Sequence, residues 1–350
     1  MKTVHVQAST EYDVLVGAGL LQTLGERASA LCKTRKTAII SDSNVWPLYG
    51  QAAEESLIHA GFQAVSFVIP AGESSKNGEV YLELLNFLAE NQLTRTDLLI
   101  ALGGGVVGDL TGFAAATYLR GVPYIQVPTT LLAAVDSSVG GKTAIDLPAG
   151  KNLAGAFYQP SLVLCDVDTL NSLPDNVFRD GCAEVIKYGI LYAPELFTHL
   201  KEYGLDFHRE DVIAQCVTLK QNVVAEDEFD TGARMKLNLG HTIGHGIEAQ
   251  SEFRISHGEA VAIGMSIVSR SAVKLGICSQ DTCDTILSVL NSFGLPTSTE
   301  FTADSLFLSA LSDKKRSGST VSLIIPQAIG DCVICATPVS ELKSFIKAGL

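Results

Sequence analysis

Three of the seven histidines stand close together in the second half of the chain. His241 and His245 are four residues apart, which places both on one face of a helix. His257 opens a second helical stretch that a short antiparallel return could bring alongside. Imidazole nitrogens gathered in this way can bind a transition metal. Spacing alone leaves a second interpretation equally open, in which these histidines only pack between helices.

A carboxylate that could complete such a site is Glu184, in the segment from Cys182 to Tyr188. It interrupts an otherwise apolar helical face, where an unpaired carboxylate would be costly. Two histidines and one glutamate around Zn²⁺ leave a fourth position for water or substrate, which is typical of a catalytic rather than a structural site. We therefore expect Glu184 to be the third ligand beside two of the histidines.

A glycine-rich turn follows the buried apolar segment that begins at Leu98. The chain runs from this strand into Gly103, Gly104 and Gly105 and then into a helical stretch containing Asp109. Glycines let the backbone approach a pyrophosphate, and the amides of a helix start favour its charge. A ligand-free strand-to-helix turn uses the same residues, so the motif alone is a moderate signal.

Polar residues at the ends of two other predicted strands support a dinucleotide site. Asp42 and Asn44 follow one strand, and the segment from Gly72 to Lys76 follows another. Open α/β sheets bind their ligands at the carboxyl ends of parallel strands. An acidic side chain at such a position could accept hydrogen bonds from ribose hydroxyls.

Several basic residues occupy sequence positions that suggest a role in binding rather than a place on the solvent-exposed surface. Lys142 and Lys151 lie beside glycines, and Lys187 lies inside an apolar helical stretch. In an acidic chain this placement favours binding of an anion. The same set includes Arg234 and three lysines for which a solvated surface charge is the commoner case: Lys220, Lys314 and Lys315.

The elements that must position these residues alternate between strand and helix in the first half of the chain. This alternation predicts βαβ units and a parallel sheet. After about residue 173 the apolar spacing becomes helical. We expect strands near 37–41, 64–70, 97–102, 124–127, 162–166 and 319–326, and helices near 46–60, 77–91, 177–191, 212–225, 260–275 and 282–293. The predicted domains are 1–175, an α/β domain with a largely parallel sheet, and 176–350, mainly helical.

Length and composition exclude several classes of protein. A chain of 350 residues exceeds what one core usually supports, and 47% hydrophobic with 18% charged residues excludes large-scale disorder. The net charge of −13 opposes generic binding to nucleic acid or anionic membranes. No segment is apolar enough to span a membrane, and the start of the chain lacks the apolar core of a signal peptide, so we expect a cytoplasmic protein.

The eight cysteines are scattered, which favours reduced thiols in the core. Cys332 and Cys335 form a CxxC pair. The sequence has no second CxxC pair to complete a zinc site, and this pair lies in an apolar segment with the pattern of a strand. We therefore interpret it as part of the core rather than as a zinc or redox motif.

Taken in order, these segments resemble the 3-dehydroquinate synthase family of sugar phosphate cyclases. The similarity runs from about Asp42 to Lys315. The matching stretches are Gly72 to Lys76, Gly103 to Gly112, Arg120 to Thr130, Val135 to Thr143, Gly150 to Phe157, Ala183 to Gly189, Asn238 to His245 and His257 to Met265.

The resemblance implies a dehydroquinate synthase-like fold and a lyase of the shikimate pathway of aromatic amino acid biosynthesis. In the family, NAD⁺ transiently oxidises 3-deoxy-D-arabino-heptulosonate 7-phosphate, phosphate is eliminated, the hydride returns, and an intramolecular aldol closure gives 3-dehydroquinate. The implied cofactors are NAD and Zn²⁺, for which Co²⁺ can substitute.

The resemblance also assigns residues. Zinc would be bound by Glu184, His241 and His257. NAD would be bound by Asp42, Asn44, Glu73, Lys76, Gly104, Gly105, Val106, Val107, Gly108, Asp109, Thr129, Thr130, Lys142, Lys151, Thr169, Leu170, Asn171 and Ser172. The substrate would meet Asp136, Lys142, Asn152, Lys187, Lys220, Arg234, Asn238, His245 and either Lys314 or Lys315, with Arg120 contributed by the second subunit of a homodimer.

Two alternative enzymes share these features. Another sugar phosphate cyclase would take a different sugar, although Lys151, Asn152, Lys220 and Asn238 favour the dehydroquinate branch. A polyol or iron-type alcohol dehydrogenase of the same fold would produce net NADH. One departure from the family pattern is Asp146, where relatives more often carry Asn.

Overall fold

The computed structural model describes residues 1–252, 254–311, 316–317 and 319–350. The chain forms two compact units. The first comprises Met1–Pro174 and Arg209–Phe229, and the second comprises Asp175–His208 and Asp230–Leu350. Lys314 and Lys315, one of which the family resemblance assigned to the substrate, lie outside the described residues.

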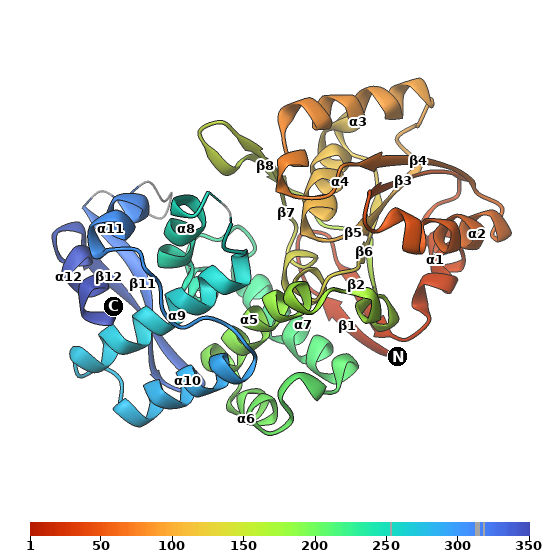
Figure 1. The fold of residues 1–350 in the computed structure, drawn as a ribbon. Helices are drawn as coiled ribbons and strands as arrows, with labels where there is room; N and C mark the ends of the chain where they lie inside the picture. The colour runs from red at the N-terminus through yellow and green to blue at the C-terminus, as the bar shows by residue number, and fades with distance from the viewer. Residues whose placement is uncertain (253, 312–315, 318) are drawn as a thin grey trace. The chain divides into compact units, whose positions relative to one another are not determined.

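The first unit is built on a seven-stranded sheet in the order β1-β2-β9-β6-β5-β3-β4 (Figure 1). Only β1 runs antiparallel to its neighbour, so the expected parallel sheet is confirmed. The strands are β1 (Lys2–Val6), β2 (Tyr12–Gly17), β3 (Lys36–Asp42), β4 (Gln63–Ile69), β5 (Leu98–Gly103), β6 (Tyr124–Pro128) and β9 (Leu162–Asp166).

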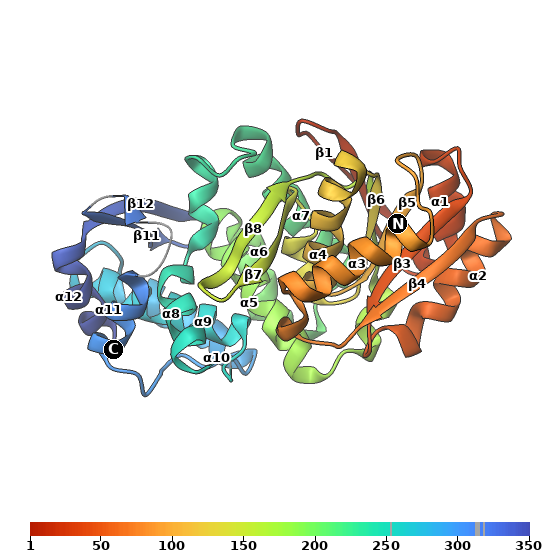
Figure 2. The ribbon, with the colours of Figure 1, turned by 90° about the horizontal axis from the view of Figure 1, so that it is seen from above.

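Helices cover both faces of this sheet (Figure 2). Successive side chains of β5 point to opposite faces: Ile100 joins a core with α1 (Leu24–Leu31) and α2 (Gln51–His59), while Leu99 joins another with α3 (Gly78–Glu90) and α4 (Gly105–Thr117). A strand buried on both faces reads as a continuous apolar run, which explains the sequence that begins at Leu98.

One helix lies in a different unit from the one expected. The segment 212–225 is helical as predicted and forms α7 (Arg209–Glu226), but α7 packs on β1, β2 and the π-turn η5 (Ala133–Ser137) of the first unit. Glu210 accepts a hydrogen bond from the Ala18 N–H at 3.2 Å, and Asp211 pairs with Lys2. Helical periodicity does not reveal which sheet a helix joins, which is why a single cut in the chain assigned α7 to the helical domain.

The first unit also contains a two-stranded hairpin that the sequence pattern did not predict. It consists of β7 (Lys142–Leu147) and β8 (Gly150–Phe157), which pair antiparallel. Half of the eight residues of β8 are alanine or glycine, which have low strand propensity. The hairpin carries Lys142, Lys151 and Asn152, three of the expected site residues.

The second unit is mainly helical, as expected, and is completed by a small antiparallel sheet in the order β10-β11-β12. Helix α9 is central, since it packs against α5, α8, α10, α12 and β11. The elements are α5 (Asp175–Tyr192), α6 (Pro194–Tyr203), α8 (His241–Gln250), α9 (His257–Lys274), α10 (Gln280–Ser292), α11 (Ala303–Leu311), α12 (Val339–Gly349), β10 (Arg316–Ser317), β11 (Thr320–Ala328) and β12 (Asp331–Pro338).

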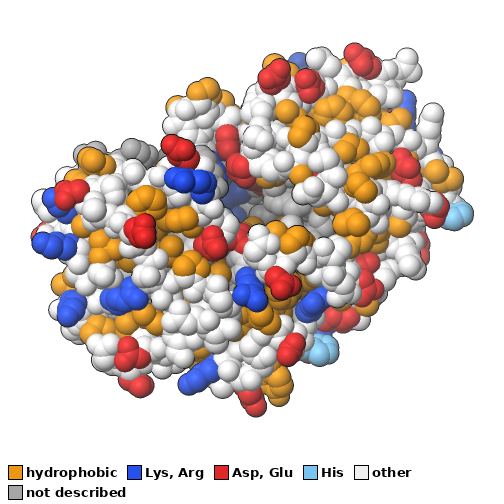
Figure 3. Space-filling view, viewed as in Figure 1, with side chains coloured by type: hydrophobic (Ala, Val, Ile, Leu, Met, Phe, Trp, Pro, Cys, Tyr) orange, Lys and Arg blue, Asp and Glu red, His pale blue; other side chains and the backbone are white. Residues whose placement is uncertain are grey.

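The surface view in Figure 3 shows acidic and basic side chains interspersed with hydrophobic ones. All eight cysteines lie among the described residues and are free thiols. Within the part of the chain that the structure describes, no helix combines the length and apolar character needed to cross a bilayer.

Candidate functional site

Three helices of the second unit bring the predicted metal ligands together. Glu184 comes from α5, His241 from the start of α8, and His257 from the start of α9. Glu184 Oε1 lies 3.5 Å from His241 Nε2 and 3.6 Å from His257 Nε2, and the three ligand atoms lie within 4.8 Å of one another. This is the spacing at which one ion can be bound by all three atoms.

The two histidine rings are oriented by acceptors on their other nitrogens. His241 Nδ1 lies 3.1 Å from the carbonyl oxygen of Leu239, and His257 Nδ1 lies 3.2 Å from Glu248 Oε2. An acceptor at Nδ1 favours a proton on that nitrogen, which leaves Nε2, on the side of Glu184, as the nitrogen that can bind a metal ion. One carboxylate and two imidazoles held in this way fit the ligand preferences of a catalytic zinc site.

The electrostatic surroundings of His257 favour a positive charge. Burial lowers the pKa of His257, but hydrogen bonds to Glu184 and Glu248 outweigh this effect and raise the pKa to about 10. Two carboxylates therefore stabilise a cation at this ring.

His245 differs from the other two histidines. Its ring is exposed and lies 5.5 Å from the His241 ring, centroid to centroid, and 6.2 Å from that of His257. Its expected place beside the substrate stays a prediction. With Glu248 and His257 it forms a second group of potential ligands, which shares His257 with the first.

Lys187 and Arg234 are buried cations. Lys187 is 1% exposed, pairs with Glu184 Oε2 one helical turn away, and lies 5.4 Å from the centre of the Tyr188 ring. Arg234 is 2% exposed in the 3₁₀ turn Ala233–Asn238. Neither is a solvated surface charge. Asn238, at the end of the same turn, donates a hydrogen bond to the carbonyl of Met235 at 3.0 Å.

In the first unit, the glycine-rich turn leads directly from β5 into α4. Among the described residues, no side chain caps the first turn of α4, so its amides keep the capacity to bind an anion. A Cβ at Gly104 would lie 3.1 Å from the Thr130 side chain, and one at Gly108 would lie 2.7 Å from Gln126 Oε1. Packing therefore requires small residues here as well, and Val107 points into the core.

Lys76 is the centre of a polar cluster beside this turn. It is 5% exposed, and its Nζ lies 2.6 Å from Asp109 Oδ2, 2.5 Å from Asn152 Oδ1 and 3.9 Å from Glu73 Oε1. Lys151 approaches Glu73 from β8 at 3.8 Å. The structure thus brings five of the sequence-predicted residues into one network.

Burial controls the acidity of this cluster. It raises the pKa of Asp109 and of Glu73, and the positive charge of Lys76 only partly offsets the effect. Burial lowers the pKa of Lys76, but the charges of Asp109 and Glu73 more than compensate, so its pKa is raised. Lys76 therefore stays protonated and partly neutralises these two half-buried carboxylates.

Other predicted nucleotide residues occupy turns at the strand ends. Asp42 Oδ1 accepts hydrogen bonds from the N–H groups of Asn44 and Val45 at 2.8 and 3.0 Å. Thr129 Oγ1 is buried and has no hydrogen-bond partner among the described residues, a polar atom that a bound ligand could satisfy. Thr130 Oγ1 accepts from the Ala133 N–H at 3.2 Å.

The predicted segment from Thr169 to Ser172 forms a 3₁₀ turn. Tyr49 donates to the Thr169 carbonyl at 3.0 Å, and Asn171 accepts from Arg209 at 2.6 Å. Leu170 is buried. These contacts fix the turn to α7 and to the segment that follows β3.

Lys220 also proves not to be a solvated charge. It is 5% exposed on α7, and its Nζ lies 2.9 Å from Asp136 Oδ1 and 2.7 Å from the Asp136 carbonyl oxygen. Lys142 and Arg120 are exposed. Leu119 and Arg120 lie in one turn, and both have left-handed φ values, 51° for Leu119 and 68° for Arg120.

Comparison with known proteins agrees with this geometry. The family model described as 3-dehydroquinate synthase N-terminal matches residues 66–180, and the one described as 3-dehydroquinate synthase C-terminal matches residues 181–316. A 3-dehydroquinate synthase from Streptococcus suis (strain 05ZYH33) is 42% identical over 99% of this chain and 100% of its own length. The chain belongs to the 3-dehydroquinate synthase family.

Solved structures extend the similarity to the whole fold. A 2-deoxy-scyllo-inosose synthase, complexed with carbaglucose-6-phosphate, NAD⁺ and Co²⁺, has a TM-score of 0.89 and 25% identity and covers 100% of both chains. The 2-epi-5-epi-valiolone synthase from Streptomyces hygroscopicus subsp. jinggangensis 5008, with NAD⁺ and Zn²⁺ bound, has a TM-score of 0.89 and 27% identity, covering 99% of this chain and 98% of that one. The dehydroquinate synthase-like fold is thereby confirmed.

Sequence reasoning missed two acidic residues beside the candidate metal ligands. Glu248 contacts His257 and lies seven residues after His241 on α8, so the helical spacing of 241, 245 and 248 could have revealed it. Asp180 contacts the start of α9. No sequence pattern predicts that contact, because it depends on which helix packs against α5.

Proposed function

We propose that this chain converts 3-deoxy-D-arabino-heptulosonate 7-phosphate into 3-dehydroquinate and phosphate, with bound NAD and a divalent metal, zinc or cobalt. The observation that carries the proposal is the convergence of Glu184, His241 and His257 within 4.8 Å, in a chain 42% identical over its length to a 3-dehydroquinate synthase. The wider family includes relatives described with NAD⁺ and Co²⁺ or Zn²⁺, which supports both cofactors.

When bound, NAD would accept and return a hydride, and the metal would polarise the substrate oxygen that loses it. Glu184, His241 and His257 would hold the metal. The glycine turn at the start of α4 and the Lys76 cluster would hold the dinucleotide, since uncapped amides and cations both favour its pyrophosphate. Thr129 Oγ1 offers a buried polar atom for the same ligand.

The substrate phosphate needs buried cations, and Lys187 and Arg234 provide them. Asp136 orients the ammonium of Lys220, so this lysine can donate a hydrogen bond from a fixed position. His245 is exposed, so it can exchange protons with solvent, and its ring lies close to the other two histidines. We propose that it moves protons to and from the substrate.

The rest of the proposed substrate set is Lys142, Asn152 and Asn238, with Arg120 reaching the site of a second subunit in a homodimer. The exposed position of Arg120 supports this role, because an exposed guanidinium can reach an anion bound to another subunit.

The decisive experiment separates a cyclase from a dehydrogenase. Metal-stripped protein is supplied with NAD⁺, Zn²⁺ or Co²⁺, and the heptulosonate phosphate, and both phosphate release and NADH absorbance are followed. We expect phosphate release that requires both cofactors, with no net NADH. Steady accumulation of NADH would instead support a polyol dehydrogenase, and turnover only with another sugar phosphate would support a different cyclase.

A matched pair of variants tests whether the assigned metal site is responsible. Glu184→Gln should lose metal-dependent phosphate release because a carboxamide is a poor zinc ligand. Glu195→Gln makes the same chemical change at an exposed position on α6 and should leave it intact. Equal activity of the two variants would contradict the assignment of Glu184 as a metal ligand.

A further inference from the structure

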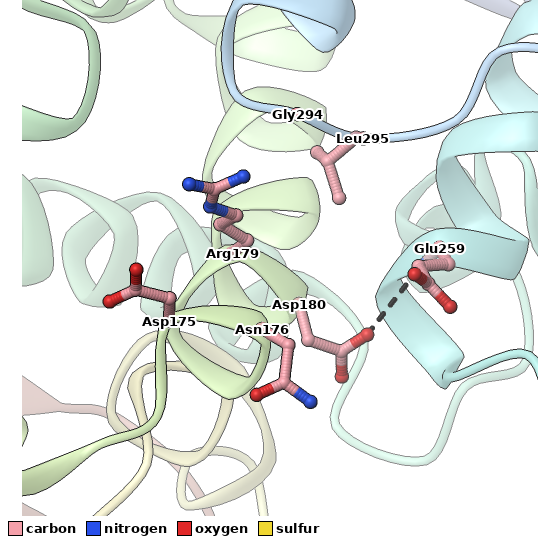
Figure 4. Close-up of a pocket in the computed structure, with 7 residues that line it drawn as sticks. All are labelled: Asp175, Asn176, Arg179, Asp180, Glu259, Gly294 and Leu295. Carbon is pink, nitrogen blue, oxygen red and sulfur yellow. Dashed lines mark hydrogen bonds between the residues drawn. The ribbon is translucent and has the colours of Figure 1, made fainter.

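Asp180 links two helices that carry metal ligands. It lies on α5, one helical turn before Glu184. Its Oδ1 accepts hydrogen bonds from the N–H of Gly258 at 2.6 Å, from the N–H of Glu259 at 3.3 Å, and from the hydroxyl of Ser256. Figure 4 shows the Asp180 side chain directed at the first turn of α9, where Glu259 lies.

The backbones of the two helices also touch at this point. A Cβ at Gly258 would lie 2.1 Å from the carbonyl oxygen of Asp180, far closer than atoms can approach. Only glycine therefore permits this contact, and the first turn of α9 lies directly against α5.

Capping alone does not explain the contact. Helix α9 already has its own capping box, in which Glu259 Oε2 accepts from the Ser256 N–H at 3.1 Å and the Ser256 hydroxyl faces the Glu259 N–H at 3.5 Å. The Asp180 carboxylate adds a tie between α9 and a second helix.

The hydrogen bonds of Asp180 lie beside a pocket, so side chains do not pack tightly against them on that side. A pocket of about 370 Å³ opens there (Figure 4). It is lined by Asp175, Asn176, Arg179, Asp180, Glu259, Gly294 and Leu295. Five of these seven residues are polar or charged, and on this side the hydrogen bonds of Asp180 tie the start of α9 to α5.

His257 lies between Ser256 and Gly258, the two residues that Asp180 binds most closely. We propose that Asp180 is a positioning residue that sets the separation between Glu184 on α5 and His257 on α9, and thereby the affinity of the site for its metal. This inference rests on the metal site of the proposed function. It concerns a residue outside the candidate ligand group of Glu184, His241 and His257.

Cobalt binding tests the proposal without measuring turnover. Co²⁺ affinity is determined by competition with a chelator, and the visible absorption bands of bound Co²⁺ report its coordination geometry. Asp180→Ala should weaken affinity about 10- to 100-fold, as is usual for residues that orient metal ligands, and should alter the bands. Asp180→Asn keeps an oxygen that can accept from the Gly258 N–H, so it should restore most of the affinity.

Asp175→Asn is the matched control, since it neutralises an exposed carboxylate on the same helix and the same pocket and should leave cobalt binding unchanged. Wild-type affinity and spectrum in Asp180→Ala would overturn the proposal even if the melting temperature fell. If that variant does not fold, Gly258→Ala, which retains the carboxylate but separates the helices, must show the same weakening for the proposal to stand. Failure of the wild-type protein to bind Co²⁺ would overturn the metal site itself.

Discussion

The imidazole of His257 lies between two carboxylates, with Nδ1 at 3.2 Å from Glu248 Oε2 and Nε2 at 3.6 Å from Glu184 Oε1. Glu248 is 4% exposed, so water screens its charge little and its contact with His257 is strong. If it orients His257 for the metal, Glu248→Ala should weaken Zn²⁺ binding about 10- to 100-fold, measured by chelator competition. Glu252→Ala removes an exposed carboxylate from the turn after α8 and should have no effect. Equal affinities would show that Glu248 is not needed to orient the ring.

Substitution of His257 and of His245 should have different effects on metal retention and on the rate of reaction. His257→Ala removes a ligand atom that lies 3.6 Å from Glu184, so purified protein should retain little zinc. His245→Ala should retain the metal and lose rate, because its proposed role is proton transfer. Metal analysis of both proteins, combined with phosphate release, checks this assignment. Equal zinc loss in both variants would place His245 among the ligands instead.

Replacing Lys187 should weaken substrate binding without weakening metal binding. Its ammonium pairs with Glu184, which must also bind the metal, so Lys187→Met should not weaken and can strengthen metal binding. The same change removes a buried cation from the proposed phosphate site and should weaken substrate binding by about 1.5 to 3 kcal/mol, or roughly 10- to 150-fold. Titrations of metal, substrate and NAD⁺ distinguish these effects, and NAD⁺ affinity should stay constant. A silent substitution in the substrate titration would move the phosphate site to Lys142, Lys220 and Arg234.

The Lys76–Asp109 pair gives a prediction for stability against pH. Lys76→Met leaves the Asp109 carboxylate, which is 19% exposed, without its closest cation, and this should cost about 1 to 3 kcal/mol at neutral pH. It also raises the pKa of Asp109 further, because Lys76 is what lowers it. An acid whose pKa is raised in the folded state loses stability as pH rises through that pKa, so the variant should be less stable at about pH 8 than at about pH 5.

Urea unfolding of the Lys76→Met variant at the two pH values measures this effect. The double variant Lys76→Met/Asp109→Asn has no titrating carboxyl at this position and should lose the additional pH dependence. A single variant whose stability follows that of the wild-type protein at both pH values would show that Lys76 does not stabilise the buried carboxylate.

The parts of the site that the sequence predicted are those set by local periodicity. His241 and His245 share a helix because four residues are about one turn, and the uninterrupted apolar run at Leu98 indicated a strand covered on both faces. Glu184 could be selected because a carboxylate in an apolar helix needs a partner. Each of these inferences needs only the chain near the residue.

The parts that could not be predicted depend on which elements meet. Asp180 and Gly258 are 78 residues apart, and nothing near either of them indicates their contact. Periodicity showed that α7 is a helix but not that it packs on β1 and β2. Lys220 looked like a surface charge for the same reason, since its partner Asp136 is 84 residues away in the sequence.

Asp146 should weaken NAD⁺ binding through its charge. Its Oδ1 accepts from the N–H of Asn152 at 2.7 Å, and Asn152 adopts a left-handed φ of 54° that this bond stabilises. Its negative charge raises the pKa of Glu73 and of Lys76, so it acts on the proposed pyrophosphate site. Asp146→Asn retains an acceptor oxygen but removes the charge. NAD⁺ should then bind more tightly by about 1 kcal/mol, or roughly fivefold.

Asp146→Ala provides the comparison, since it removes both the charge and the acceptor for the Asn152 N–H. Without that hydrogen bond the turn that presents Asn152 to Lys76 loses its support, so NAD⁺ should bind more weakly than to Asp146→Asn. Calorimetric titration at two ionic strengths separates the two contributions, because salt screens the charge effect and leaves the turn unaffected. Weaker NAD⁺ binding in Asp146→Asn than in the wild-type protein, at low salt, would show that the carboxylate supports the nucleotide site instead of opposing its charge.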